Sequence, residues 1–172
     1  MRTILFLSAV LIFGLASCNN NIRTIDEGVV INGVRWATNN VETPGTFAKN
    51  PESAGGFFTW DEAQNACPRG WRLPTADELQ ILHNATDEEW TARRGVNGRT
   101  FGIAPNRIFL PAAGARNTYG TLFNVGSLGY YWGSSPRTDA TLAPVVLLLQ
   151  QSNSDVPDDY AAYGISVRCV AE

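Results

Sequence analysis

The sequence predicts an α+β fold built from two or three short helices and a larger number of short strands. Charged residues make up only 17% of the 172 residues, and the chain carries 16 glycines and 9 prolines. This composition favours a turn-rich chain over a helical bundle. Short apolar segments between turn signals predict the strands, and threonine–glutamate motifs predict the helix starts. The length fits one domain, and the 44% hydrophobic content excludes a disordered chain, collagen and a coiled coil.

The charge balance limits the possible partners. The formal net charge is −3, so no basic field exists to attract nucleic acid or an anionic membrane surface. The chain has a single histidine, which argues against a histidine-rich metal site and against a catalytic site with several histidines. We therefore expect no nucleic acid partner, no metal and no cofactor.

The N-terminus has the pattern of an export signal. A positive start at Met1-Arg2 precedes an apolar stretch at 4–15, which is too short for a membrane span of about twenty residues. The following Leu-Ala-Ser-Cys at 15–18 resembles the lipobox of bacterial lipoproteins, in which cleavage precedes a cysteine that is then lipidated. This predicts a signal peptide at 1–17, a lipidated tether at 18–28 and a domain at 29–172. An ordinary signal peptide followed by an incidental cysteine is the alternative.

The lipobox resemblance also predicts a location and a redox state. Cys18 would anchor the protein in the cell envelope; an outer-membrane site is favoured, and either side of that membrane stays open. Disulfides persist outside the cytoplasm, and Cys67 and Cys169 remain once Cys18 is assigned. Neither belongs to a metal-type Cys-x-x-Cys pair, so we predict that they pair with each other. Two free buried thiols are the alternative.

The first half of the domain is expected to hold one hairpin and the helices. Asn32-Gly33 between two apolar runs predicts a hairpin at 29–36, because both residues accept a positive φ. Residues 37–58 are rich in glycine and proline and predict a long ordered loop. Three capping-box motifs predict helix starts at 59–62, 75–78 and 86–89. Their paired carboxylates are interpreted as caps and not as general acid–base pairs.

The first two helices should each bury one face. The first would bury Ala63, Ala66 and Cys67 before Pro68 ends it, and the second would bury Leu79 and Leu82 before Asn84 ends it. His83 lies beside this second apolar stripe, so we interpret it as a structural histidine. An enzyme would instead place His83 in a deep pocket beside an acid and a nucleophile.

The second half of the domain predicts short strands. They are expected at 100–103, 107–110, 130–132, 145–149 and 165–170, with a glycine-rich stretch at 114–129. The unbroken apolar run at 145–149 predicts a central strand that is buried on both faces. Alternation in 165–170 places Cys169 with the apolar side chains, as an internal disulfide requires.

Seven segments together carry a recognisable family pattern: 33–41, 55–63, 66–75, 78–79, 110–114, 129–135 and 163–170. They resemble the Fibrobacter succinogenes major paralogous domain, which is widespread in lipoproteins and secreted proteins of Bacteroidetes. The most specific parts are Cys-Pro-Arg-Gly-Trp-Arg-Leu-Pro-Thr at 67–75 and Ser-Val-Arg-Cys-Val at 166–170. The resemblance implies a C-type lectin-like fold, with helices on small antiparallel sheets and the chain ends together. It implies the same disulfide, and structural roles for Trp36, Trp60, Trp71, Arg72, Leu73, Pro74, Trp132 and Arg168.

The resemblance implies less about function. Calcium-dependent sugar binders of this fold carry a Glu-Pro-Asn or Gln-Pro-Asp triplet, and Ala104-Pro105-Asn106 lacks the carboxylate. Formylglycine-generating relatives use redox-active cysteines, which the predicted disulfide would occupy here. We therefore predict a non-catalytic envelope lipoprotein that binds a glycan, a peptide or a protein surface. A structural or fimbria-like envelope subunit is the first alternative.

The ligand is expected at the loops of 133–163. A second alternative is the variable target protein of a diversity-generating retroelement, because such proteins display a hypervariable face just before a similar ending. Polar and aromatic side chains in 133–163 have the composition of a recognition surface, although an ordinary solvated loop has it too. The candidate ligand-binding residues are Ser134, Ser135, Arg137, Gln150, Asn153, Asp155, Tyr160 and Tyr163.

Overall fold

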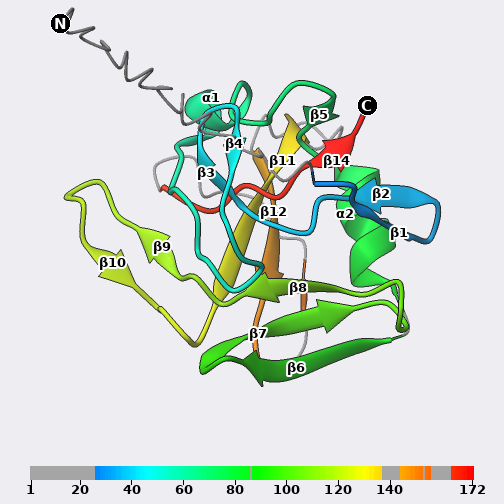
Figure 1. Cartoon of the computed structure of the whole chain (residues 1–172). Helices are drawn as coiled ribbons and strands as arrows, with labels where there is room; N and C mark the ends of the chain where they lie inside the picture. The colour runs from blue at the N-terminus through cyan, green and yellow to red at the C-terminus, as the bar shows by residue number, and fades with distance from the viewer. Residues whose placement is uncertain (1–25, 86, 137–143, 153, 156–163) are drawn as a thin grey trace, which may run out of the picture.

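A computed structural model describes residues 26–85, 87–136, 144–152, 154–155 and 164–172 (Figure 1). The described part has two short helices and many short strands, which confirms the α+β prediction. The elements are β1 (Val29–Ile31), β2 (Val34–Trp36), β3 (Val41–Thr43), β4 (Thr46–Phe47), α1 (Trp60–Ala63), β5 (Trp71–Arg72), α2 (Ala76–His83), β6 (Glu88–Arg93), β7 (Val96–Phe101), β8 (Ile108–Pro111), β9 (Ala115–Arg116), β10 (Leu122–Phe123), β11 (Gly129–Pro136), β12 (Pro144–Leu149), β13 (Ser154–Asp155) and β14 (Val170–Ala171). Across these ranges no helix is long and apolar enough to span a membrane.

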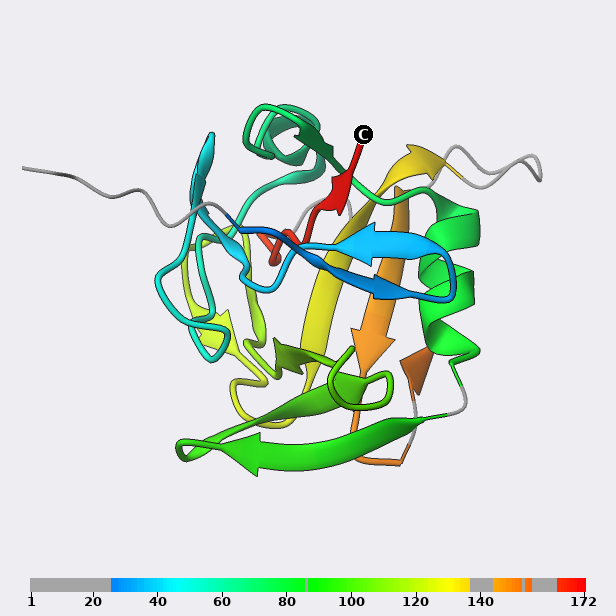
Figure 2. The same ribbon diagram turned by 45° about the vertical axis from the view of Figure 1, so that its right-hand side comes forward.

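The strands form small antiparallel sheets. Three of them have the strand orders β1-β2-β14-β5, β6-β7-β8 and β11-β12-β13, and two further pairs are β3-β4 and β9-β10. In the first sheet β14 lies between β2 and β5, so the C-terminal strand joins the N-terminal hairpin (Figure 2). The two ends of the domain are therefore fixed against each other by backbone hydrogen bonds.

The predicted disulfide between Cys67 and Cys169 is present. The two Cα atoms lie 6.0 Å apart, and the bond links residues separated by 102 positions. Cys169 is completely buried, as the alternation in 165–170 indicated. The alternative of two free thiols is therefore wrong.

The hairpin and two of the three predicted helix starts are confirmed. Asn32 and Gly33 have φ values of 47° and 85°, and they connect β1 to β2. Complete capping boxes at Thr59 and Thr75 begin α1 and α2. Helix α1 ends at Ala63, well before Pro68, and turns lead from there to the disulfide.

The third predicted helix start, at 86–89, is wrong because Glu88–Arg93 is the strand β6. Arg94 and Gly95 both have positive φ, 49° and 81°, which is the backbone of a tight two-residue hairpin turn. That turn pairs β6 with β7 along six residue pairs, from Glu88 with Phe101 to Arg93 with Val96. The capping motif is only four residues long, and the six residue pairs of the β6–β7 ladder stabilise the strand more than this motif stabilises a helix start.

Two further segments differ in detail from the prediction. The expected loop at 37–58 contains the small β3–β4 pair, which turns at Pro44-Gly45. The expected last strand at 165–170 is regular only from Val170, although every side chain from Ile165 to Val170 is buried. Strand β12 is the central strand of its sheet and is almost wholly buried, as predicted.

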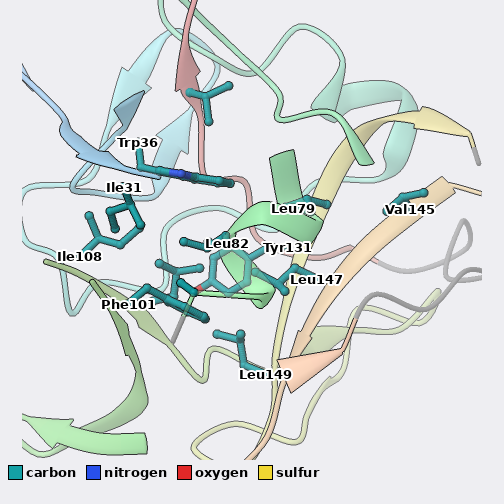
Figure 3. Packing of buried hydrophobic residues seen from close by; sticks show 13 residues of the cluster. Ile31, Trp36, Leu79, Leu82, Phe101, Ile108, Tyr131, Val145, Leu147 and Leu149 are labelled. Carbon is teal, nitrogen blue, oxygen red and sulfur yellow. The ribbon is translucent and has the colours of Figure 1, made fainter. Parts of the chain in front are cut away.

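The core consists of two clusters of buried side chains. The first packs α2 and β12 against the N-terminal hairpin, and Trp36, Leu82 and Tyr131 lie near its centre (Figure 3). The second surrounds Trp132 and holds Ala63, Ala66 and the sulfur of Cys169. The two faces of the β11–β12 pair contribute to different clusters, since Tyr131 belongs to the first and Trp132 to the second.

Candidate functional site

The described members of the predicted ligand-binding set lie at two ends of one ladder. Ser134 and Ser135 are near the end of β11, where the N–H of Ser134 donates to the carbonyl oxygen of Pro74 at 2.8 Å. Gln150 follows β12 at the opposite end, where Gly129 pairs with Leu149. These ends are roughly 15 Å apart along the strands. The structure does not bring the serines and Gln150 into one surface.

The other members add little to a common site. Asp155 lies in β13 and pairs with Leu148, so it is on the Gln150 side of the sheet. Arg137, Asn153, Tyr160 and Tyr163 lie outside the described residues, and so does the predicted lipidation site Cys18.

The structure does bring His83 together with a hydroxyl and a carboxylate. The Nδ1 atom of His83 lies 2.7 Å from Oγ of Ser154, and that hydroxyl donates to Oε2 of Glu88 at 2.9 Å. The other carboxylate oxygen of Glu88 pairs with Arg99 at 3.0 Å. These three residue types are the ones that a serine hydrolase uses, so the order of the hydrogen bonds decides what the group can do.

The order is wrong for activating a nucleophile. A hydroxyl has one proton, and Ser154 gives it to Glu88, so His83 must donate its Nδ1 proton to the serine oxygen. A catalytic histidine accepts the serine proton and is itself oriented by the acid. The side chain of Ser154 is also completely buried. The geometry is that of a structural network which ties α2, β6 and β13 together.

Arg99 extends this network to the residues after β12. Its Nη2 atom donates to the carbonyl oxygens of Gln150 and Gln151. The side chain of Arg99 is only 5% exposed, so these bonds fix the backbone at Gln150 from within the fold. Gln150, a predicted ligand residue, therefore contributes its main chain to internal packing.

A second buried network is centred on Arg168. Its guanidinium donates to Oδ1 of Asn40 at 2.9 Å and to the carbonyl oxygens of Ala37, Thr38 and Phe109 at 3.0–3.1 Å. Burial lowers the pKa of Arg168 to about 10, so the group still carries its charge at neutral pH. The side chain joins the loop after β2 to strand β8.

Asp26 brings an opposite charge to the same loop. Its carboxylate accepts hydrogen bonds from the N–H groups of Thr38 and Asn39 at 2.7 and 3.1 Å, while Arg168 binds the carbonyl oxygen of Thr38. Asp26 lies within the tether predicted at 18–28 and is only 9% exposed. The packed part of the domain therefore already includes Asp26.

Tyr131 packs against this network, and burial raises the pKa of its hydroxyl to about 12. An unfolded tyrosine ionises near pH 10. The folded state therefore keeps a proton on Tyr131 that the unfolded state releases, so the contribution of Tyr131 to stability falls as pH rises from 10 towards 12. At pH 11 this contribution amounts to about 1.4 kcal/mol.

We expect Tyr131→Phe to abolish this alkaline loss. The variant should be about 1 kcal/mol less stable than the wild type at pH 8, because the hydroxyl no longer donates to the carbonyl oxygen of Pro111. The difference in the free energy of unfolding between wild type and variant should disappear by pH 11, and urea unfolding at the two pH values would measure it. Tyr119→Phe is the control, because Tyr119 is exposed and should follow the wild type. The same difference at pH 11 as at pH 8 would show that the raised pKa of Tyr131 does not cause the alkaline loss of stability.

An exposed apolar hairpin is the feature that sequence reasoning missed. Strands β9 and β10 project from the body of the domain, with the connecting tip at residues 117–121 (Figure 1). Tyr119 at the tip is 92% exposed, and Leu122 and Val125 are 45% and 62% exposed. These are three of the six large apolar side chains that are exposed in the described part of the chain. We name Tyr119, Leu122 and Val125 the hairpin knob.

The tip of this hairpin is held rigidly. Oδ1 of Asn117 accepts hydrogen bonds from the N–H groups of Tyr119 and Thr121 at 3.0 and 2.9 Å. The main chain of Asn117 also bonds to Thr121 and Gly120. Such a side-chain turn fixes the backbone beneath Tyr119 before any partner arrives. The turn residues Asn117 and Gly120 were the only sequence signal of this tip.

Strand β9 of the hairpin is joined to Gly164, the residue that follows the predicted ligand region in the chain. Arg116 and Gly164 exchange two backbone hydrogen bonds of 2.8 Å, and the Arg116 guanidinium lies 5.4 Å from the centre of the Phe57 ring. The hairpin therefore lies beside the point at which the chain leaves the predicted ligand region.

A comparison with known protein families shows which family the chain is related to. The sequence model of the Fibrobacter succinogenes major domain matches residues 18–171, which is nearly the whole chain. The chain belongs to this family. The resemblance predicted from the sequence motifs is thus confirmed, and the family name points to a protein of the bacterial envelope. No curated protein and no solved structure matches the chain significantly.

The Fibrobacter succinogenes major domain motifs at 71–75 serve the folding of α2. Arg72 makes two 2.7 Å hydrogen bonds to the carboxylate of Glu78, and Glu78 also caps the helix at Thr75. The Arg72 side chain lowers the pKa of Glu78, so the carboxylate stays ionised for both tasks. Leu73 and Pro74 are buried beside it.

The tryptophans of the family motifs also have internal partners. Trp36 and Trp132 are completely buried, and Nε1 of Trp132 donates to the carbonyl oxygen of Phe58 at 2.7 Å. Trp71 packs edge-on against Phe47, with ring centres 5.5 Å apart. Trp60 donates to the carbonyl oxygen of Gly133 at 3.4 Å.

In the part that the structure describes, no group of three or more potential metal-ligating side chains gathers.

Proposed function

We propose that this chain is a non-catalytic lipoprotein of the bacterial cell envelope, anchored through Cys18, which recognises a protein surface through the hairpin knob. The observation that carries the proposal is the hairpin itself, which displays a 92% exposed tyrosine on a hydrogen-bonded tip and is followed along the chain by exposed Leu122 and Val125. Large exposed apolar side chains on a soluble domain are candidates for interaction sites when several occur on one element. A convex knob of this kind is suited to filling a pocket on a partner protein, whereas small ligands bind in concave sites.

The proposal includes a C-type lectin-like fold for the domain. Its support is the disulfide from the first helical region to the last strand, together with the pairing of β14 with β2. Two helices on small antiparallel sheets also agree with that fold. The likeness concerns shape, and fold alone does not assign a sugar ligand.

The non-catalytic part of the proposal is supported by the hydrogen-bond order at His83. The one arrangement of histidine, serine and acid that we find in the described ranges directs the serine proton to Glu88. Its hydroxyl is fully buried in a network that includes the Arg99 ion pair. These groups have internal partners that stabilise the fold.

The test compares binding by matched surface variants. The mature chain would be applied to an array of envelope proteins and peptides and to a glycan array. Each immobilised molecule that binds would then be titrated with every variant. We expect immobilised proteins to bind, and we expect Tyr119→Ala to reduce the affinity for them by at least about 30-fold, because a central exposed aromatic anchor contributes about 2 kcal/mol or more. Ile81→Ala removes an exposed apolar side chain of α2, outside the knob, and should leave binding unchanged.

Three outcomes would contradict the proposal. Equal losses for Tyr119→Ala and Ile81→Ala would show that the knob is not the contact. Binding to glycan features alone would assign recognition to another surface. Self-association of the wild type that Tyr119→Ala removes, measured by sedimentation velocity, would favour the structural envelope subunit instead.

A further inference from the structure

A small open cleft lies away from the hairpin knob. It has a volume of about 200 Å³, and its walls come from the β1–β2 hairpin, the end of α2 and the segment after β7. The lining residues are Val30, Ile31, Asn32, Ala85, Asp87, Gly102, Ile103 and Asn106. Three segments that are distant in sequence therefore converge on one concave site.

One side of the cleft is apolar and partly displayed to solvent. Ile103 is 65% exposed and Val30 is 42% exposed, while Ile31 and Ala85 are buried beneath them. With the three residues of the hairpin knob, these two account for five of the six exposed large apolar side chains among the described residues. These two side chains offer apolar contact area to an apolar face of a ligand.

The remaining lining residues are polar, and the backbone that carries them is fixed. Asp87, Asn32 and Asn106 are exposed at the cleft. The N–H of Gly102 donates to the carbonyl oxygen of Asp87 at 3.1 Å, which ties the start of β6 to the segment after β7. Gly102 has a φ of +89°, and a Cβ there would lie 2.3 Å from the carbonyl oxygen of Asn106. Only glycine lets the chain close this tightly around the cleft.

The charges around the cleft leave one net negative charge, because Arg107 is paired with Glu89 and the lining itself contains Asp87 but no basic residue. Its lining residues include one carboxylate, on Asp87, and no lysine or arginine. Immediately beside it, Nε of Arg107 donates to the carbonyl oxygen of Gly102, and the same guanidinium lies 3.9 Å from Glu89. An anionic ligand is therefore disfavoured here, while a hydroxyl of a neutral ligand can donate to the carboxylate of Asp87 and bond to the side-chain amides of Asn32 and Asn106.

We propose that this cleft binds a single neutral pyranose unit of a glycan. A pyranose has one apolar C–H face, which fits Ile103 and Val30, and a rim of hydroxyls, which fits Asp87, Asn32 and Asn106. The volume is below the roughly 300–1,000 Å³ of sites for drug-sized ligands, so it fits one ring. The site is independent of protein recognition by the hairpin knob, and neither proposal requires the other.

The test is a titration of the ¹⁵N-labelled protein with methyl pyranosides, followed by amide chemical shifts. We expect a neutral methyl glycoside of glucose, mannose, galactose or N-acetylglucosamine to shift the amides of Asn32, Ala85 and Ile103 in a saturable way. Asp87→Asn should weaken that binding about tenfold, because a charge-assisted hydrogen bond is lost. Asp77→Asn makes the same charge change at the other end of α2 and should leave the affinity unchanged. Tyr119→Ala should also leave it unchanged.

The alternatives are separated by two further probes. If n-butylammonium shifts the same amides and no glycoside does, the cleft is a site for basic side chains and the proposal is wrong. Glycoside shifts that do not saturate, or that Asp87→Asn and Asp77→Asn reduce equally, would also overturn it. Thermal unfolding of each variant shows whether it is folded, and Ile103→Ser provides a second variant on the apolar side of the cleft.

Discussion

Replacing Cys67 and Cys169 together by alanine is expected to lower the free energy of unfolding by about 4–5 kcal/mol. The bond closes a loop across 102 positions of sequence, and in the chain-entropy model most of its effect is to restrict the unfolded state. The same bond fixes β14 in the sheet with β2, next to the point where the N–H of Ala37 donates to the carbonyl oxygen of Cys169. Its loss should therefore loosen the joined ends of the chain first.

Urea unfolding of the oxidised wild type and of the double variant would measure this effect. The dependence on urea concentration should become steeper in the variant, because its unfolded state exposes more surface. Wild type reduced with a thiol is the control and should lose a similar amount. A loss below about 1 kcal/mol with an unchanged urea dependence would show that the bond does not constrain the unfolded chain.

The parts of the fold that could be predicted from sequence depend on neighbouring residues. Asn32-Gly33 specifies its own turn, and Thr75 with Glu78 specifies the start of a helix within four residues. The same local rule failed at 86–89, because the hairpin formed by Arg94-Gly95 gives β6 six partners on β7. A short motif predicts structure only where no longer-range pairing competes for the same residues.

The partners of the buried polar groups could not be predicted, because they are chosen by tertiary packing. Arg168 binds acceptors that lie 59 to 131 positions away, and His83 meets a serine 71 positions away. Nothing in the local pattern distinguishes a buried arginine from a solvated one. The family motif indicated that Arg168 matters, and only the structure shows what it binds.

The candidate site could be predicted in part from topology. Residues 129–136 and 144–149 pair as antiparallel strands, and such pairing places the residues after the second strand at the opposite end from the loop that joins the two. That rule separates Ser134 from Gln150. The hairpin knob and the cleft depend instead on which apolar side chains the core leaves uncovered, and the sequence does not specify this.

Arg168→Met is expected to destabilise the domain by about 3–5 kcal/mol, because it removes the buried guanidinium that donates to four oxygen acceptors. Methionine has a similar length and fills the space, so the loss reports the hydrogen bonds and the charge more than a cavity. Arg35→Met is the matched control, because Arg35 is exposed and donates one hydrogen bond, to the carbonyl oxygen of Glu27. This variant should change the free energy of unfolding by no more than about 0.5 kcal/mol. Urea unfolding of both variants measures the difference.

Arg168→Lys separates the contribution of the charge from that of the hydrogen bonds. Lysine keeps the positive charge near Asp26, but it has three donors on one atom and cannot reach Asn40, Thr38 and Phe109 as a planar guanidinium does. We expect its stability to lie between those of the wild type and Arg168→Met. Amide exchange at 37–40 should quicken in the same order, since this loop is where the donors are lost. Equal stability of the lysine variant and the wild type would show that charge alone holds the loop, whereas a methionine variant as stable as the wild type would show that the four acceptors find other donors.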